Sequence, residues 1–440
     1  MEPLRRTAPR NLEFGIYRDG DNNLDVSQSA VLRQARSVSQ RDRSIEFTVE
    51  DTSSGVFHSP VTERSTIADG REQTAGAIRG DDMASPKNLA AFVARTLDNA
   101  ERSGAKQTWI ELVDHGAGDG GGLEADSFKQ LMPMPQIAEA IADGIALHAK
   151  SHPEDAARNI DGVVANQCLM ASLGFADALS HAGVRWLAAS PETMVSPGVP
   201  SSVADAIARN IDSQGAMARA IVSETMQQTY GAGAFSWKPA AAFDVLDLAA
   251  EKRRAVERDV KALNDAIAAR TSDGQTISAL RDDASGVQGM VRFPEATADM
   301  PWHADRPASE LFGKFARDAR LDPQLRGAAA RAERSVRNLV LAHGESSSFA
   351  PFGGADYRDA AGPTVHFPVT QRSVDPWAPR VTETHNAFFA ETDAAAAERA
   401  LASEKAGRER PAFIVGPLRS YWPRSPAGSV IIFALASKAC

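Results

Sequence analysis

The segment of residues 109–122 reads W-I-E-L-V-D-H-G-A-G-D-G-G-G. A short apolar run stops here at Asp114-His115-Gly116, and a glycine-rich loop follows. A buried strand that ends in polar residues and glycines delivers those residues to the carboxyl edge of an open sheet, where ligands bind in α/β proteins. The question that follows is which other residue would act together with His115.

A second segment of this kind, residues 160–170, reads I-D-G-V-V-A-N-Q-C-L-M and contains Cys168. Small residues over 171–182 predict a helix that begins directly behind the cysteine. A cysteine is nucleophilic as the thiolate, and its pKa falls near a helix N-terminus or a histidine. Cys168 is therefore a candidate nucleophile.

Both residues also have structural interpretations. Cys168 suits a small buried apolar position, and His115 suits a cap or a hydrogen-bonded structural role. Two strand ends, each followed by small residues, favour the functional interpretation, because neighbouring parallel strands would bring both side chains to one edge. Gly116 would then allow close approach of a substrate, and its amide and that of Cys168 could form an oxyanion hole.

The first half of the chain alternates strand and helix patterns. This order predicts an α/β fold with a largely parallel sheet and right-handed crossovers. Residues 51–83 are polar and rich in turn residues, which predicts a long surface excursion. Strands are expected at 12–17, 44–50, 109–113, 160–168 and 185–190, and helices at 25–36, 85–104, 135–150, 171–182 and 203–228.

The pattern changes beyond residue 245. We predict a core over residues 12–240 and a mixed α/β C-terminal region over 241–440, of unassigned role, that packs on the core or completes its sheet. In this region helices are expected at 246–269 and within 309–343, a helix or linker at 392–405, and strands at 364–369, 412–415 and 429–436.

Composition excludes several classes of protein. A net charge of −9 argues against a general binder of nucleic acid or of anionic membranes. Two cysteines are too few for a disulfide framework or a cysteine zinc site, and they fit a reducing compartment. Without an apolar signal segment or a membrane-spanning run, we expect a cytoplasmic protein, or one exported without a cleavable signal peptide.

Two further motifs are interpreted structurally. The acidic loop at 18–25 superficially resembles a calcium loop, but Leu24 and Ala30 stand where its glycine and glutamate belong, so we expect a turn and a helix cap. The H-x-x-x-H pair of His148 and His152 is expected on the surface, since no H-E-x-x-H motif is present.

Several blocks of the sequence resemble clostripain-like cysteine peptidases, which are relatives of caspases, gingipains and legumains. These proteins have D-H-G after one strand and D-A-C-L-M after a later one. His115 and Cys168 are 53 positions apart, close to the roughly 50 of caspases. The resemblance covers about residues 12–240, with matching blocks at 17–25, 85–92, 113–116, 166–170, 189–192 and 197–198, and loosely at 362–368.

The resemblance implies a caspase-like α/β fold and a Cys/His dyad that cleaves peptide bonds. Cys168 would attack the scissile carbonyl, His115 would transfer a proton to the leaving amine, and the amides of Gly116 and Cys168 would hold the oxyanion. The substrate would be a protein or peptide, with no nucleic acid or membrane partner. No cofactor is expected, although calcium dependence is known within the family.

One departure concerns the substrate pocket. The family commonly has aspartate two positions before the cysteine, in a pocket for Arg or Lys, but this chain has the neutral Asn166, followed by Gln167 in place of alanine. Ser190 and Glu192 also match the pocket loop, so either Glu192 compensates or the pocket accepts a neutral polar side chain. The leading interpretation is a cysteine endopeptidase; the alternatives are a catalytically silent scaffold that binds a protein partner, and a hydrolase or transferase of small amides.

Overall fold

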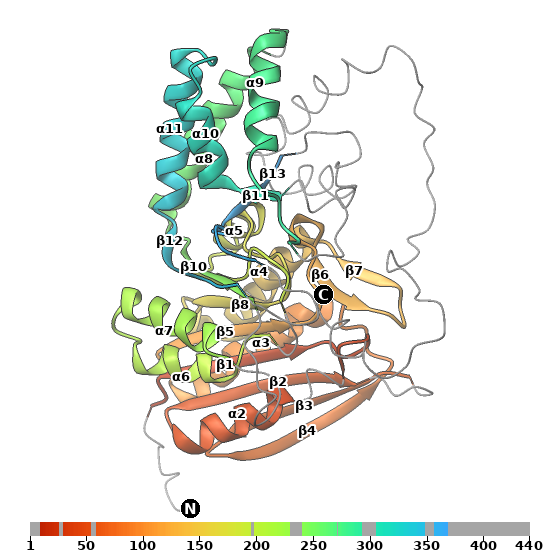
Figure 1. Ribbon diagram of the computed structural model, residues 1–440. Helices are drawn as coiled ribbons and strands as arrows, with labels where there is room; N and C mark the ends of the chain where they lie inside the picture. Colours follow the sequence, from red (N-terminus) through yellow and green to blue (C-terminus); the bar gives the residue numbers. More distant parts are fainter. Residues whose placement is uncertain are drawn as a thin grey trace, which may run out of the picture.

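The computed structural model forms a large sheet with helices on both faces and a group of helices standing above one end (Figure 1). Among the described residues, no helix combines the length and the apolar composition needed to cross a membrane. The structure describes residues 9–25, 30–53, 59–194, 198–228, 240–270, 272–292, 305–347 and 356–367.

The central sheet has nine strands in the order β12-β10-β9-β8-β5-β1-β2-β3-β4. Five central strands run parallel to one another: β9, β8, β5, β1 and β2. At each end the sheet continues by antiparallel pairing, through β10 and β12 beside β9 and through β3 and β4 beside β2. The expected caspase-like α/β fold, a mostly parallel sheet flanked by helices, is confirmed. The core strands are β1 (Leu12–Arg18), β2 (Ile45–Ser53), β5 (Gln107–Val113), β8 (Gly162–Asn166) and β9 (Trp186–Ala189).

Alternate residues of the central strands are buried on opposite faces of the sheet. Ile110 and Leu112 pack toward α3, α4 and α5, whereas Trp109 and Val113 pack toward α2, α6 and α7. Burial on both faces explains the nearly continuous apolar run at 109–113. The helices are α2 (Ala30–Arg41), α3 (Pro86–Ser103), α4 (Met134–Ser151), α5 (Leu173–His181), α6 (Ser202–Arg209) and α7 (Gln214–Met226).

The expected surface excursion at 51–83 is wrong. Strand β2 continues to Ser53, and β3 (Val61–Ala68) and β4 (Arg71–Arg79) form an antiparallel hairpin that extends the sheet. The inward side chains of β3 include Thr62 and Ser65, and β4 is exposed along most of its length. Such a hairpin lacks the apolar alternation by which strands are recognised.

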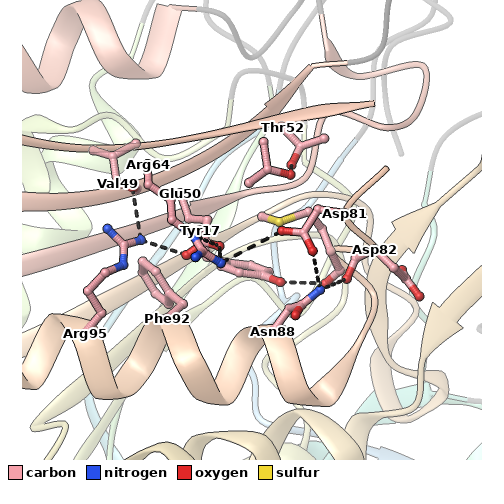
Figure 2. A network of polar contacts seen from close by, with 12 residues as sticks. Tyr17, Val49, Glu50, Thr52, Arg64, Asp81, Asp82, Asn88, Phe92 and Arg95 are labelled. Carbon is pink, nitrogen blue, oxygen red and sulfur yellow. Dashed lines mark hydrogen bonds and ion pairs between the residues drawn. The ribbon is translucent and has the colours of Figure 1, made fainter. Parts of the chain in front are cut away.

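Polar side chains join this hairpin to the parallel strands and to α3 (Figure 2). The buried carboxylate of Glu50 in β2 accepts hydrogen bonds from Arg64 of β3 at 2.8 Å and from Arg95 of α3 at 2.7 Å. The buried hydroxyl of Tyr17 donates to the carbonyl of Met83 at 2.8 Å. These contacts hold β2, β3 and α3 in one unit.

The C-terminal region supplies the other edge of the sheet. Strand β10 (Ala242–Asp247) pairs antiparallel with β9, and β12 (Val340–Glu345) pairs with β10. Four helices between them share a separate apolar cluster. They are α8 (Ala250–Ala268), α9 (Gly274–Ser285), α10 (Ala308–Arg317) and α11 (Pro323–Arg337).

Several C-terminal boundaries differ from the prediction. The helix expected at 246–269 starts at Ala250, because β10 continues to Asp247. The helical pattern of 309–343 is divided before Pro323, where Asp322 caps α11, and it ends in β12. Thr364–His366 forms β13, which pairs with β11 (Asp305–Pro307). The elements expected at 392–405, 412–415 and 429–436 lie outside the described residues.

Candidate active site

The two motifs that carry His115 and Cys168 follow neighbouring strands. Strands β5 and β8 are parallel partners, with Val113 opposite Asn166. Because the strands run in the same direction, the residues that follow them emerge at one edge of the sheet, as the sequence predicted. The amide of Asp114 donates to the carbonyl of Asn166 at 3.4 Å and extends the pairing past the strand end.

The two turns lie directly against each other. A Cβ atom added to Gly116 would be 2.2 Å from the carbonyl oxygen of Cys168 and 2.9 Å from its nitrogen. A Cβ atom on Gly122 would be 2.3 Å from the side-chain nitrogen of Gln167, which donates to the carbonyl of His115 at 2.9 Å. Glycine is therefore required at position 116, where the contact is with backbone atoms, whereas a Cβ atom at position 122 would mainly displace the side chain of Gln167.

The imidazole of His115 is buried and held by one polar partner. Its Nε2 lies 2.7 Å from the Oδ1 atom of Asn23. When Nε2 donates its proton to this amide oxygen, Nδ1 keeps a lone pair that can accept a proton. Burial lowers the pKa of His115 to about 4, so the ring is neutral near pH 7. Asn23 was not predicted as a site residue, although its place in the matching block at 17–25 was a signal for it.

Asp114 holds the backbone of the histidine loop. Its Oδ1 atom accepts hydrogen bonds from the amide of His115 at 2.5 Å and from the side chain of Asn22 at 2.6 Å. Burial, together with the nearby charge of Asp19, raises the pKa of Asp114 well above its usual value. Burial likewise raises the pKa of Asp19 to about 8. Asp114 therefore positions the loop that carries His115.

Cys168 is buried in a turn between β8 and α5. The helix expected at 171–182 is confirmed as α5, but it does not begin directly behind the cysteine, because Leu169 adopts a left-handed φ of 66° and the helix starts at Leu173. A helix dipole acts within about one turn, so its effect on the thiol is weaker than the sequence suggested. The amide of Met194 donates a hydrogen bond to Sγ of Cys168 at 3.0 Å.

Asn166 lies inside the protein and is only 3% exposed. Its amide nitrogen donates to the carboxylate of Glu111 at 2.9 Å, and its oxygen accepts from the amide of Val199 at 2.9 Å. Burial raises the pKa of Glu111 to about 8, and the hydrogen bond from Asn166 opposes this rise. Asn166 therefore joins β8, β5 and the loop at Val199.

Ser190 and Glu192 lie in the loop that covers the cysteine turn. The amide of Leu169 donates to the carbonyl of Glu192 at 3.1 Å, and the hydroxyl of Ser190 donates to the same carbonyl at 2.8 Å. The carboxylate of Glu192 is buried, 3.4 Å from Nε of Arg292, and accepts from the amide of Val291. Burial raises the pKa of Glu192 to about 7. Nothing in the sequence pattern indicated Arg292 as its partner.

Potential metal ligands gather elsewhere. Among the described residues, groups of three or more histidine and carboxylate side chains close enough to share an ion occur near the C-terminal ends of α3 and α4 and beside α5. None of these groups includes His115 or Cys168.

The histidine and cysteine turns at the ends of two central parallel strands define a caspase-like arrangement.

Comparison with models of protein families found no match, and comparison with curated protein sequences found no significant one. Solved structures do match. A secreted C11 cysteine protease from Bacteroides thetaiotaomicron, iotapain, superimposes with a TM-score of 0.60 at 14% identity, over 88% of this chain and 100% of that chain. A structure of a secreted C11 cysteine protease from the same organism, in complex with an irreversible peptide inhibitor, superimposes with a TM-score of 0.59 at 11% identity, over 87% of this chain and 99% of that chain.

An inactive zymogen C11 protease from Parabacteroides distasonis superimposes with a TM-score of 0.53 at 15% identity, over 86% of this chain and 96% of that chain. At these identities the similarity establishes the fold. The chain therefore has the fold of the C11, or clostripain-like, cysteine proteases, as the sequence blocks at 12–240 predicted.

Proposed function

We propose that the chain is a cysteine endopeptidase in which Cys168 is the nucleophile and His115 transfers protons. The observation that carries the proposal is the direct packing of Gly116 on the backbone of Cys168, at the ends of two neighbouring parallel strands. This contact brings the histidine loop, the cysteine turn and two backbone amides to one edge of the sheet.

In this mechanism neutral His115 takes the proton of the Cys168 thiol, and the thiolate attacks the carbonyl carbon of the peptide. The amides of Gly116 and Cys168 hold the resulting oxyanion. The C–N bond breaks as the imidazolium gives its proton to the leaving amine. Water, deprotonated by His115, then attacks the thioester and releases the acid and the free thiol.

The proposed pocket is formed by Asn166, Gln167, Ser190 and Glu192. The amide of Asn166 is occupied by Glu111 and Val199, and the carboxylate of Glu192 is paired with Arg292. These residues therefore offer no free negative charge to an arginine or lysine side chain. We propose that the enzyme prefers a neutral polar residue before the cut.

The test is hydrolysis of a peptide library varied at the residue before the cut, in reducing buffer, with either calcium or a chelator. We expect the parent chain to cleave without an added cofactor, Cys168→Ala and His115→Ala to be inactive, and Cys440→Ala to remain active as the matched cysteine control. Cleavage by Cys168→Ala would contradict the proposed nucleophile, and a preference for Arg or Lys would contradict the proposed pocket.

The alternative function is a catalytically silent scaffold that binds a protein partner. Gln167 favours it, because its side chain is held against the histidine loop rather than left free for a substrate. A thiol-reactive peptide probe separates the two functions, since only the enzyme requires His115 for labelling of Cys168. An enzyme of small amides would instead hydrolyse small amides and leave the peptide library intact.

A further inference from the structure

Two histidines lie one turn apart at the C-terminal end of α4, facing the end of α3. His148 and His152 stack with ring centroids 4.9 Å apart and planes 19° apart. The expected surface position is wrong for His148, whose side chain is 0% exposed, whereas the side chain of His152 is 32% exposed. Asp98 and Glu101 of α3 face these rings.

One carboxylate lies close to both rings. The Oδ1 atom of Asp98 is 2.7 Å from Nδ1 of His148 and 3.4 Å from Nε2 of His152. These three side chains each offer a ligand atom within 4.8 Å of the others. Two imidazole nitrogens and a carboxylate oxygen, with water in the fourth position, form a tetrahedral set that suits Zn²⁺.

The second nitrogen of each ring also faces a carboxylate. Nδ1 of His152 is 2.8 Å from Glu101, and Nε2 of buried His148 is 3.7 Å from Asp155. Within the part of the chain that the structure describes, this Nε2 atom has no hydrogen-bond partner. In metal sites the free N–H of a ligating histidine commonly points at a carboxylate, which fixes the tautomer and the ring orientation. Both rings have this arrangement.

We propose that Asp98, His148 and His152 bind one divalent transition-metal ion of the zinc type, with Glu101 and Asp155 orienting the two rings. Imidazole ligands favour such an ion over calcium or magnesium, which prefer oxygen. The partly exposed side chains of Asp98 and His152 leave a path from solvent.

This site is separate from the candidate active site. Helix α4 starts at Met134, close to the glycine-rich loop, and the histidines lie at its other end, about 25 Å away at 1.5 Å per residue. The metal would join α3 to α4 and stabilise this face of the sheet. The site therefore stands independently of whether Cys168 is a nucleophile.

A second group offers a matched control. Asp177, His181 and Glu257 also lie within ligand distance of one another. This group has a single imidazole, however, and its Nε2 is 3.0 Å from the guanidinium of Arg253, which opposes a metal cation. Replacing His181 removes a histidine from the chain without touching the proposed site.

The experiment is a titration of the 440-residue chain with Co²⁺, followed by competition with Zn²⁺. Both Cys168 and Cys440 are changed to Ala, so that no thiol binds the metal. We expect one cobalt ion per chain, with the visible absorption of a four-coordinate site. His152→Gln and Asp98→Asn should each weaken binding by at least ~100-fold, whereas His181→Gln should leave it unchanged.

Thermal unfolding provides the second measurement. Zn²⁺ should raise the Tm of the parent chain and of His181→Gln but not that of His152→Gln. Unchanged unfolding of His152→Gln without metal shows that this variant is folded. Absence of cobalt binding by the parent chain, or binding that survives in both His152→Gln and Asp98→Asn, overturns the proposal.

Discussion

The side-chain amide of Asn166 in β8 donates a hydrogen bond of 2.9 Å to the carboxyl group of Glu111 in the neighbouring strand β5. The second oxygen of Glu111 is buried and has no hydrogen-bond partner among the described residues. Since burial raises the pKa of Glu111 to about 8, a protonated carboxyl group lies beneath the candidate active site at neutral pH. The pair therefore couples the stability of the central strands to pH.

Replacing Glu111 by Gln should reduce this coupling. Glu111 has a pKa of 4.5 when unperturbed and about 8 when folded, so between these values the folded state holds a proton that the unfolded chain releases. The contribution of Glu111 to the free energy of unfolding is therefore present in full below pH 4.5. As pH rises toward 8 this contribution is lost, by up to about 1.4 kcal/mol per pH unit. Urea unfolding at pH 5 and pH 8 should show that the free energy of unfolding falls less with pH for Glu111→Gln than for the parent chain. Equal falls in the two proteins would contradict this assignment.

Asn23→Ala should slow the proposed peptidase by about fivefold in kcat with little change in KM. The reason is that His115 loses the amide that orients its ring, a hydrogen bond of about 1 kcal/mol. Asn23→Asp keeps the acceptor and adds a negative charge, so it should raise the pKa of His115 and move the acidic limb of the pH–rate profile to higher pH. Identical profiles for all three proteins would contradict the role of Asn23.

Gly116→Ala should abolish activity and destabilise the fold, because the new Cβ would lie 2.2 Å from the carbonyl oxygen of Cys168. Gly76→Ala is the matched control, since nothing lies within 4 Å of a Cβ at that position in β4. Peptide hydrolysis and thermal unfolding measure the two effects. A Gly116→Ala enzyme with the activity of the parent chain would show that the two turns need not touch.

Arg292→Ala should destabilise the protein by about 3 kcal/mol at pH 8, because it leaves the buried carboxylate of Glu192 without its cation. The pKa of Glu192 is already raised to about 7, so at pH 5 the group is protonated and the loss should be smaller. Denaturant unfolding at both pH values measures the difference, with the exposed Arg358→Ala as control. Equal losses at both pH values would contradict the pairing.

The central strands were predictable because strands buried on both faces need continuous apolar runs. Ile110 and Trp109 pack on opposite faces, and this two-sided burial is visible as W-I-E-L-V. The His115 and Cys168 motifs were expected at one edge on the condition that their strands are parallel neighbours, and the pairing of β5 with β8 meets this condition. The β3–β4 hairpin was missed because its inward side chains include Thr62 and Ser65, which carry no apolar signal.

Contacts between distant segments were the other part that the sequence did not reveal. Asn23 and His115 are 92 positions apart, and no local pattern joins them. Arg292, within the C-terminal region, reaches Glu192 across a similar separation in sequence. The turn at Leu169 was also hidden, because a left-handed φ at a leucine has no sequence signature.

Strands β5 and β8 lie at the middle of the nine-stranded order, with at least three strands between them and either edge. Local opening of a sheet starts at edges such as the exposed strand β4 and reaches central strands only on global unfolding. Backbone amides of β5 and β8 should therefore exchange with deuterium last, and those of β4 first. The geometry that joins His115 to Cys168 would then persist through partial openings of the molecule and be lost only with the whole fold.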